Sequence, residues 1–184
     1  MDSALISRID ALTKAFQNGK FFEVKRIGKE SIKDAVVKNS QDFAAISVIS
    51  YSLYKMLSKE KFTKSKRWPT ITKIIVAALQ KSSEALKKEN IKSFETNIEN
   101  AVNEIKIVDD DLSNYVKNIF EKAKVKEAST AYALGLSIGQ SADLTGADKA
   151  ELQKYIGFTR IHDEQVISRS LSQRLKNLKA ELAK

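Results

Sequence analysis

Residues that break helices are scarce in this chain, and that scarcity constrains its fold more than any other feature. Only one proline and six glycines occur among 184 residues, whereas the helix-favouring residues alanine, leucine, lysine and glutamate are plentiful. Apolar residues recur at intervals of three and four nearly throughout, and no stretch alternates clearly between apolar and polar residues. The sequence therefore predicts an all-α fold.

Residues 1–125 are expected to form one domain, an antiparallel helical bundle. Its hairpin around Gly19 resembles a tetratricopeptide-type unit, but no convincing second copy follows at a period of about 34 residues, so an ordinary hairpin is the better default. We expect a polar loop or frayed turn at residues 58–68, then Pro69 in the first turn of a helix. The predicted helices cover residues 2–17, 21–37, 41–58, 69–88, 90–107 and 109–124.

Polar residues mark two of these helix starts. Asn90 is a candidate cap, and the acidic residues 109–111 are expected to cap the helix that follows them. The same three aspartates could hold a divalent ion, although helix capping is the commoner role of such residues.

The second predicted domain, residues 126–184, begins with a segment that has the spacing of a helix-turn-helix. Four of the six glycines fall between residues 135 and 157. The motif needs a small residue in its first helix, a glycine four positions later for a left-handed turn, and apolar residues six and nine positions after that glycine. Each of its two helices also needs an N-cap. The residues that meet these requirements are Ser137, Ala142, Gly146, Asp148, Leu152 and Tyr155.

The run Gly-Leu-Ser-Ile-Gly-Gln-Ser-Ala-Asp-Leu-Thr-Gly, which begins at Gly135, resembles the helix-turn-helix of small prokaryotic antitoxin-type regulators. The tail that follows it resembles that of uncharacterised archaeal proteins with the same motif. The resemblance covers residues 128–163, implies a DNA-binding transcription regulator, and says nothing of residues 1–127. Ser141 and Thr145 depart from the pattern, because apolar residues are usual there. Ile138 and Leu144 could supply the missing packing.

Helix-turn-helix geometry also occurs in proteins that never contact DNA, so the shape alone does not give the function. If the second helix enters a major groove, its exposed side chains would contact bases, and residues nearby would contact the phosphate backbone. The alternative is that these residues are only solvated surface side chains. The candidates are Lys149, Ala150, Gln153 and Lys154 for the groove, and Gln140 and Arg160 for the backbone.

A formal net charge of +9 suggests a polyanionic partner such as nucleic acid, although the protein could simply be basic. Residues 61–90 hold eight basic and two acidic residues, whereas residues 128–184 hold eight and six. The basic centre therefore lies outside the helix-turn-helix segment. Its candidate phosphate contacts are Lys61, Lys64, Lys66 and Arg67.

Two aromatic residues, Phe62 and Trp68, are interleaved with this basic segment. Such a mixture suits RNA or ribosome association, in which cations neutralise phosphates while an aromatic ring stacks on a base. The alternative is a lysine-rich loop whose tryptophan is packed into the core, as large aromatic side chains usually are.

The last predicted helix, residues 163–183, carries four leucines at coiled-coil-like spacing. A homodimer formed through it would suit a helix-turn-helix that reads paired half-sites, although packing on its own domain is slightly favoured. The leucines are Leu171, Leu175, Leu178 and Leu182.

Enzymatic chemistry is not expected. The chain has no cysteine and a single histidine, His162, and it shows no phosphate-binding glycine loop, no nucleophile elbow and no metal-ligand spacing. We therefore expect neither a cofactor nor a metal. The start of the sequence does not resemble a signal peptide, and no apolar run approaches the roughly 20 residues of a membrane span, so a cytoplasmic protein is expected.

Two functions compete. The leading hypothesis is a nucleic-acid-binding regulator, with DNA favoured over RNA, because of the spacing at residues 137–157 and the net charge. The alternative is a helical interaction module in which residues 1–127 bind a protein partner and the helix-turn-helix serves only for packing.

Overall fold

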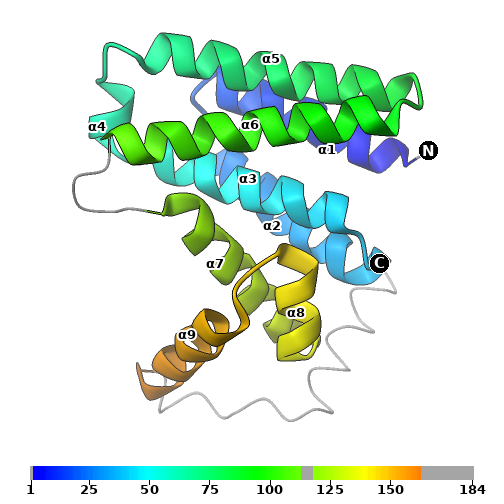
Figure 1. Cartoon of the computed structure of the whole chain (residues 1–184), viewed down its shortest axis with the longest axis vertical. Coiled ribbons are helices and arrows are strands. Elements are labelled where there is room, and N and C mark those ends of the chain that lie inside the picture. The colour runs from blue at the N-terminus through cyan, green and yellow to red at the C-terminus, as the bar shows by residue number, and fades with distance from the viewer. Residues whose placement is uncertain (1, 113–117, 163–184) are drawn as a thin grey trace. The chain divides into compact units, whose positions relative to one another are not determined.

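A computed structural model gives the fold and describes residues 2–112 and 118–162. These two ranges contain helices and turns and no strand, which confirms the predicted all-α class. The helices, shown in Figure 1, are α1 (Ser3–Gln17), α2 (Phe21–Lys38), α3 (Gln41–Leu57), α4 (Glu60–Thr63), α5 (Trp68–Lys87), α6 (Ile91–Leu112), α7 (Ile119–Leu134), α8 (Ile138–Thr145) and α9 (Lys149–His162). The terminal helix predicted at residues 163–183 lies outside the described residues.

Four helix ends in the described ranges close in the same way. A left-handed residue follows the helix, and the next backbone amide donates to an alanine carbonyl five residues earlier, at 2.9 to 3.0 Å. This arrangement satisfies carbonyl groups that the helix end leaves without partners, and it turns the chain sharply. The left-handed residues are Gly19, Asn39, Glu89 and Gly146.

Contacts between residues divide the chain into two compact units. Unit 1 comprises residues 1–29 and 49–120, and unit 2 comprises residues 30–48 and 121–184. Helices α2 and α3 therefore contribute residues to both units. The predicted boundary after residue 125 separates parts that are expected to fold independently. Contacts between residues do not test independent folding, so this boundary stays a prediction.

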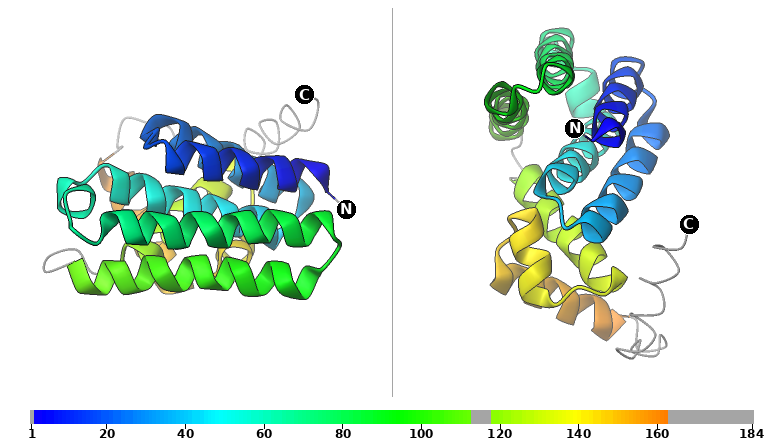
Figure 2. Two further views of the ribbon diagram at one scale, coloured as in Figure 1. Left: turned by 90° about the horizontal axis from the view of Figure 1, so that it is seen from above. Right: turned by 90° about the vertical axis from the view of Figure 1, so that its right-hand side faces the viewer.

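Unit 1 is built around α1, α5 and α6. Helices α5 and α6 run antiparallel and side by side in Figures 1 and 2, and α1 packs on α5. Lys87 also bonds to Asp10 at 3.0 Å, which ties α5 to α1. Burial would raise the pKa of Asp10, but the neighbouring Ser83 hydroxyl, Lys87 and the charge of Lys14 outweigh burial and lower it.

Helix α6 is longer than predicted. It continues to Leu112, so residues 109–111 belong to its last turn, and the prediction that they cap a helix reaching Lys124 is wrong. Helix α7 begins only at Ile119. The apolar stripe explains the difference, since it keeps its spacing of four and three residues through Val108, past the predicted end of this helix at residue 107. The buried residues of that stripe are Phe94, Ile98, Ala101, Ile105 and Val108.

The features predicted at the starts of α5 and α6 are present. Pro69 lies in the first turn of α5, and Asn90 Oδ1 accepts a hydrogen bond from the Ser93 amide at 3.0 Å, where α6 begins. Both features are local, so they follow from neighbouring residues alone.

Residues 58–68 are not simply a loop. They include the short helix α4, and Phe62 is fully buried because it forms part of the core of unit 1. Trp68 is half-buried and meets Phe16 edge to face, with ring centroids 6.0 Å apart. Both aromatic rings therefore pack against other residues of the fold. Packing of this kind is the predicted alternative to stacking on RNA bases.

None of the described helices combines the length and the apolar character that crossing a bilayer requires.

Candidate nucleic-acid interface

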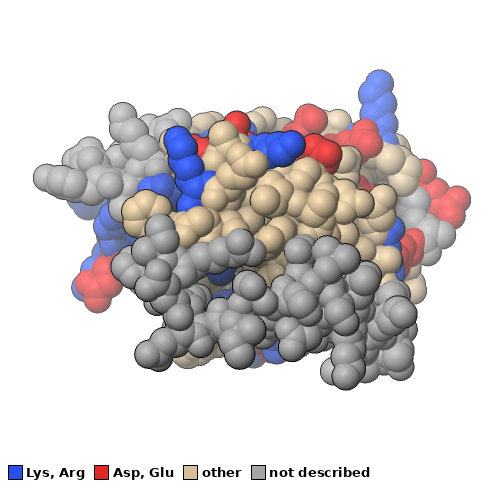
Figure 3. All heavy atoms as spheres, turned by 90° about the horizontal axis from the view of Figure 1, so that it is seen from below, with Lys and Arg blue, Asp and Glu red and all other residues tan. Residues whose placement is uncertain are grey.

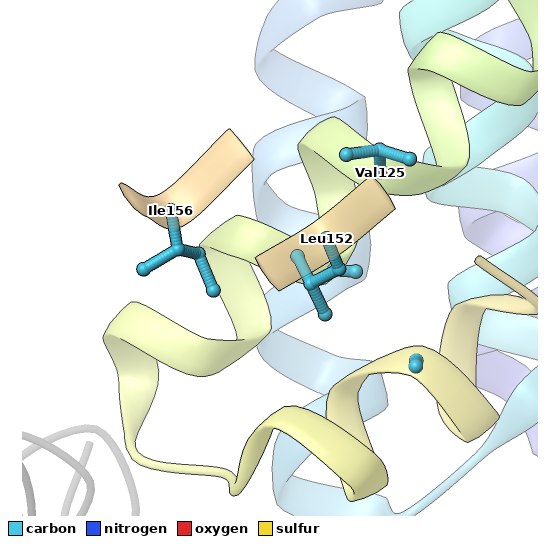
Figure 4. Close-up of a cluster of buried hydrophobic side chains, with 5 residues drawn as sticks. Val125, Leu152 and Ile156 are labelled. Atoms are coloured by element: carbon cyan, nitrogen blue, oxygen red, sulfur yellow. The ribbon is translucent and has the colours of Figure 1, made fainter. Parts of the chain in front are cut away.

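Helices α7, α8 and α9 of unit 2 share a small apolar core, which we call the three-helix cluster. Figure 4 labels three of its members, Val125 from α7 and Leu152 and Ile156 from α9. Ala128 of α7 and Ala142 of α8 complete it, and Leu152 has no exposed surface. Because most helical stability in proteins comes from packing of an apolar face, this shared burial holds the three helices together. Partly buried side chains packed against it are Tyr132, Ile138, Ala147 and Tyr155.

Helix α8 begins with a reciprocal capping box. The Gln140 amide donates to Ser137 Oγ at 3.1 Å, and the Ser137 amide donates to Gln140 Oε1 at 3.0 Å. Two backbone N–H groups that the helix cannot satisfy thus find side-chain acceptors. Ser137 has the capping role that its position predicts. The Gln140 carboxamide, proposed as a phosphate contact, has its oxygen engaged in the cap.

The turn between α8 and α9 spans only three residues. Gly146 ends α8 with a left-handed backbone, φ 68°, and the Ala147 amide donates to the Ala142 carbonyl at 3.0 Å. Asp148 Oδ1 then accepts from the Glu151 amide at 2.8 Å, which caps the start of α9. The glycine and the cap are where the sequence places them, and together they set the direction in which α9 leaves the turn.

Two glycines of this segment should respond to alanine in opposite ways. Gly146→Ala is expected to cost about 1–2 kcal/mol of stability, because the left-handed backbone strains any L side chain. No steric clash adds to that cost, since the nearest atom to a new Cβ is Lys124 Cε at 3.9 Å. Gly157→Ala, inside α9 with nothing within 4 Å, should instead stabilise by about 0.5–1 kcal/mol. Urea unfolding of both variants measures the difference, and equal effects would contradict this account of the turn.

Helix α9 presents a polar face away from the three-helix cluster. Lys149, Ala150, Gln153 and Lys154 are all exposed, while Leu152 lies inside the cluster. The four groove candidates are therefore accessible on a single helix. The side chain of Arg160 lies outside the described residues.

Two aromatic residues of α9 differ in their surroundings. Tyr155 is half-buried against the cluster, and Lys126 of α7 lies over its ring with Nζ 5.9 Å from the centroid. Phe158, which is not among the predicted site residues, is 69% exposed.

The polar residues that depart from the usual motif are buried. Ser141 is fully buried, and its Oγ has no hydrogen-bond partner among the described residues. Thr145 Oγ1 donates to the Ser141 carbonyl at 2.9 Å, which satisfies its hydroxyl within α8. Leu144 is buried, and Ile138 packs against the three-helix cluster. These two residues therefore supply apolar contacts from α8, as expected for a helix with polar residues at 141 and 145.

A buried carboxylate in unit 2 was not foreseen. Ser47 Oγ of α3 donates to Glu127 Oε2 of α7 at 2.6 Å, and both residues are buried. The bond joins residues 80 positions apart, so no local pattern signals it. The part played by α7 was detectable, because Val125, Ala128 and Tyr132 follow helical spacing.

The predicted basic segment belongs to unit 1, whereas α9 belongs to unit 2. Lys64 pairs with Glu60 at 2.7 Å, and Lys61 lies over the Phe62 ring with Nζ 4.9 Å from its centroid. Lys66 and Arg67 are exposed. The side chains of Lys61 and Lys64 thus already have interaction partners close by in the sequence.

Comparison with known proteins yields no family: no family model, no curated protein and no solved structure matches the chain.

Charge in this part of the molecule is mixed. Residues 119–162 contain six basic and five acidic residues. On the face drawn in Figure 3, lysine and arginine side chains lie among acidic side chains and uncharged surface. The described residues contain no group of three or more histidine, aspartate or glutamate side chains placed to hold a metal ion.

Proposed function

We propose that this protein is a non-enzymatic regulator that binds duplex DNA by inserting α9 into the major groove. The observation that carries the proposal is the capped α8, the left-handed turn at Gly146 and the polar exposed face of α9, all built on one small core. A helix supported in this way can project side chains into a groove while the preceding helix lies across the backbone.

The chemistry of the exposed face suits this role. Gln153 can pair with adenine through its carboxamide, and Lys154 can donate to guanine or to a phosphate. Lys149, in the first turn of α9, is suited to a phosphate. Because acidic residues nearly balance basic ones in residues 119–162, we expect few phosphate contacts and a modest affinity for random sequence.

Salt dependence of duplex binding tests this proposal. The full chain should retain a labelled random-sequence duplex at about 50 mM salt, and three phosphate contacts would weaken binding by about 40-fold on raising salt to about 200 mM. Fluorescence anisotropy measures both quantities. No retention at the lower salt concentration would rule out DNA binding of this kind.

A further inference from the structure

Four aromatic rings form a continuous run on unit 1, where α2 begins and α3 ends. The ring centroids of Phe22 and Phe21 are 4.0 Å apart, those of Phe21 and Tyr54 are 6.0 Å apart, and those of Tyr54 and Tyr51 are 6.0 Å apart. Phe22 is 73% exposed and the other three rings are half-buried. We call these four residues the aromatic run. It offers a flat apolar face to solvent at one end and is anchored in the fold at the other.

Basic side chains accompany the aromatic run. Lys25 Nζ lies 5.0 Å from the Tyr54 ring centroid, and Lys55 Nζ lies 5.3 Å from the Tyr51 centroid and 5.6 Å from that of Tyr54. These cations are therefore held against the rings by contacts of the cation–π kind. They also remain close enough to the surface to meet an anion, since both lysines are only half-buried.

An open hollow adjoins the exposed end of the run. Its lining contains two basic residues, Lys20 and Arg26, and one acidic residue, Glu23, which pairs with Lys20 at 3.7 Å. The hollow is lined by Gly19, Lys20, Phe21, Phe22, Glu23 and Arg26.

Aromatic faces next to cations suit a ligand that has flat rings and negative charge at short intervals. A single nucleic-acid strand has both, because its unpaired bases can stack on aromatic rings while its phosphates meet lysine and arginine. A duplex hides its base faces within the stack and could not use Phe22 in this way. We propose that the aromatic run of unit 1 binds single-stranded nucleic acid, with a base stacked on Phe22 and phosphates neutralised by Lys25 and Lys55.

This site is separate from the one proposed on α9. It uses residues of unit 1, a different form of nucleic acid and stacking in place of groove contacts, so either proposal can fail without the other.

Replacing Phe22 tests the stacking. Fluorescence anisotropy of the full chain with labelled oligo(dT) and oligo(U) of about 12 nucleotides compares DNA with RNA. Phe22→Ala should weaken binding by about fivefold to 150-fold, and Phe22→Leu nearly as much, whereas Phe22→Trp should retain it. Equal binding by the leucine and wild-type proteins would overturn the proposal, because the contact at residue 22 would then not depend on an aromatic ring. Ile91→Ala, at an exposed apolar residue elsewhere in unit 1, is the matched control and should bind like wild type.

A spectroscopic measurement reports the stack itself. In the Phe22→Trp protein, adding oligo(dT) should quench the fluorescence of the new indole, because a stacked base lies against it. The wild-type protein, whose single tryptophan is half-buried Trp68, supplies the background. Quenching no greater than in wild type would contradict stacking at this position.

The cations are tested in the same binding assay. Lys25→Ala with Lys55→Ala should lower the slope of log affinity against log salt by about 0.7 for each lost phosphate contact with a single strand. Lys81→Ala, an exposed lysine of the same unit, should leave the slope unchanged. Lys154→Ala should also leave it unchanged, which separates this site from the one proposed on α9. A slope that Lys25 and Lys55 do not affect would overturn the assignment of the phosphates.

Discussion

Leu152→Ala is expected to lower the free energy of unfolding of the α7–α9 region by about 2–5 kcal/mol. Leu152 is fully buried, and it packs with residues of all three helices in a cluster of only five buried members. So small a core has few neighbours that could move to fill the cavity. Alanine would therefore remove apolar burial and leave most of the cavity empty.

Hydrogen exchange is the appropriate measurement, because it reports the opening of this region even if the rest of the chain stays folded. Amides of α8 and α9 should lose protection in Leu152→Ala and keep it in Gln153→Ala, an exposed neighbour on the same helix. A loss below about 1 kcal/mol would show that the three-helix cluster does not hold α9 in place, since such core truncations ordinarily cost more.

Lys154→Ala is expected to weaken duplex binding by about 1–3 kcal/mol if Lys154 contacts a base, with relaxed sequence preference at one position. If Lys154 contacts only a phosphate, the loss should be uniform across sequences and the salt slope should fall by about one. Both outcomes follow from its exposed place on α9. Anisotropy titrations with several duplexes distinguish them.

The matched control is Lys122→Ala. It removes one exposed lysine from α7 in the same unit, so it changes the net charge equally while leaving the face of α9 intact. Lys122→Ala should bind duplex DNA nearly as well as wild type. Equal weakening by the two variants would mean that binding reflects overall charge and not α9.

Local chemistry was predictable from the sequence. Ser137, Gly146 and Asp148 have the capping and turning roles expected of them, because each acts on backbone groups within three residues or through its own φ. Asn90 caps α6 for the same reason.

Errors arose where distant packing outweighed a local signal. The aspartates at residues 109–111 look like caps, but the apolar stripe that continues through Val108 keeps them within α6. Phe62 stands among lysines, yet it is fully buried because the fold brings apolar surface to it. The contacts that bury Phe62 and extend α6 involve residues distant in the sequence, so the pattern within one segment does not reveal them.

The aromatic run shows the same limit at a candidate site. Phe21 and Phe22 are adjacent in the sequence and suggest nothing beyond the start of a helix. Tyr51 and Tyr54 lie about thirty residues further along, and only the packing of α2 against α3 within unit 1 joins the four rings. A site built from side chains of two helices can be recognised only when the packing of those helices is known.

The central claim is that α9 is the DNA-contacting element, and mapping of backbone amide resonances during a duplex titration tests it most directly. With ¹⁵N-labelled full-length protein, the account predicts that the largest shifts fall on α9 between Lys149 and Phe158 and on the turn at Gly146. Amides of α1 and α5 should barely move. Shifts absent from α9, or concentrated in unit 1, would contradict the claim.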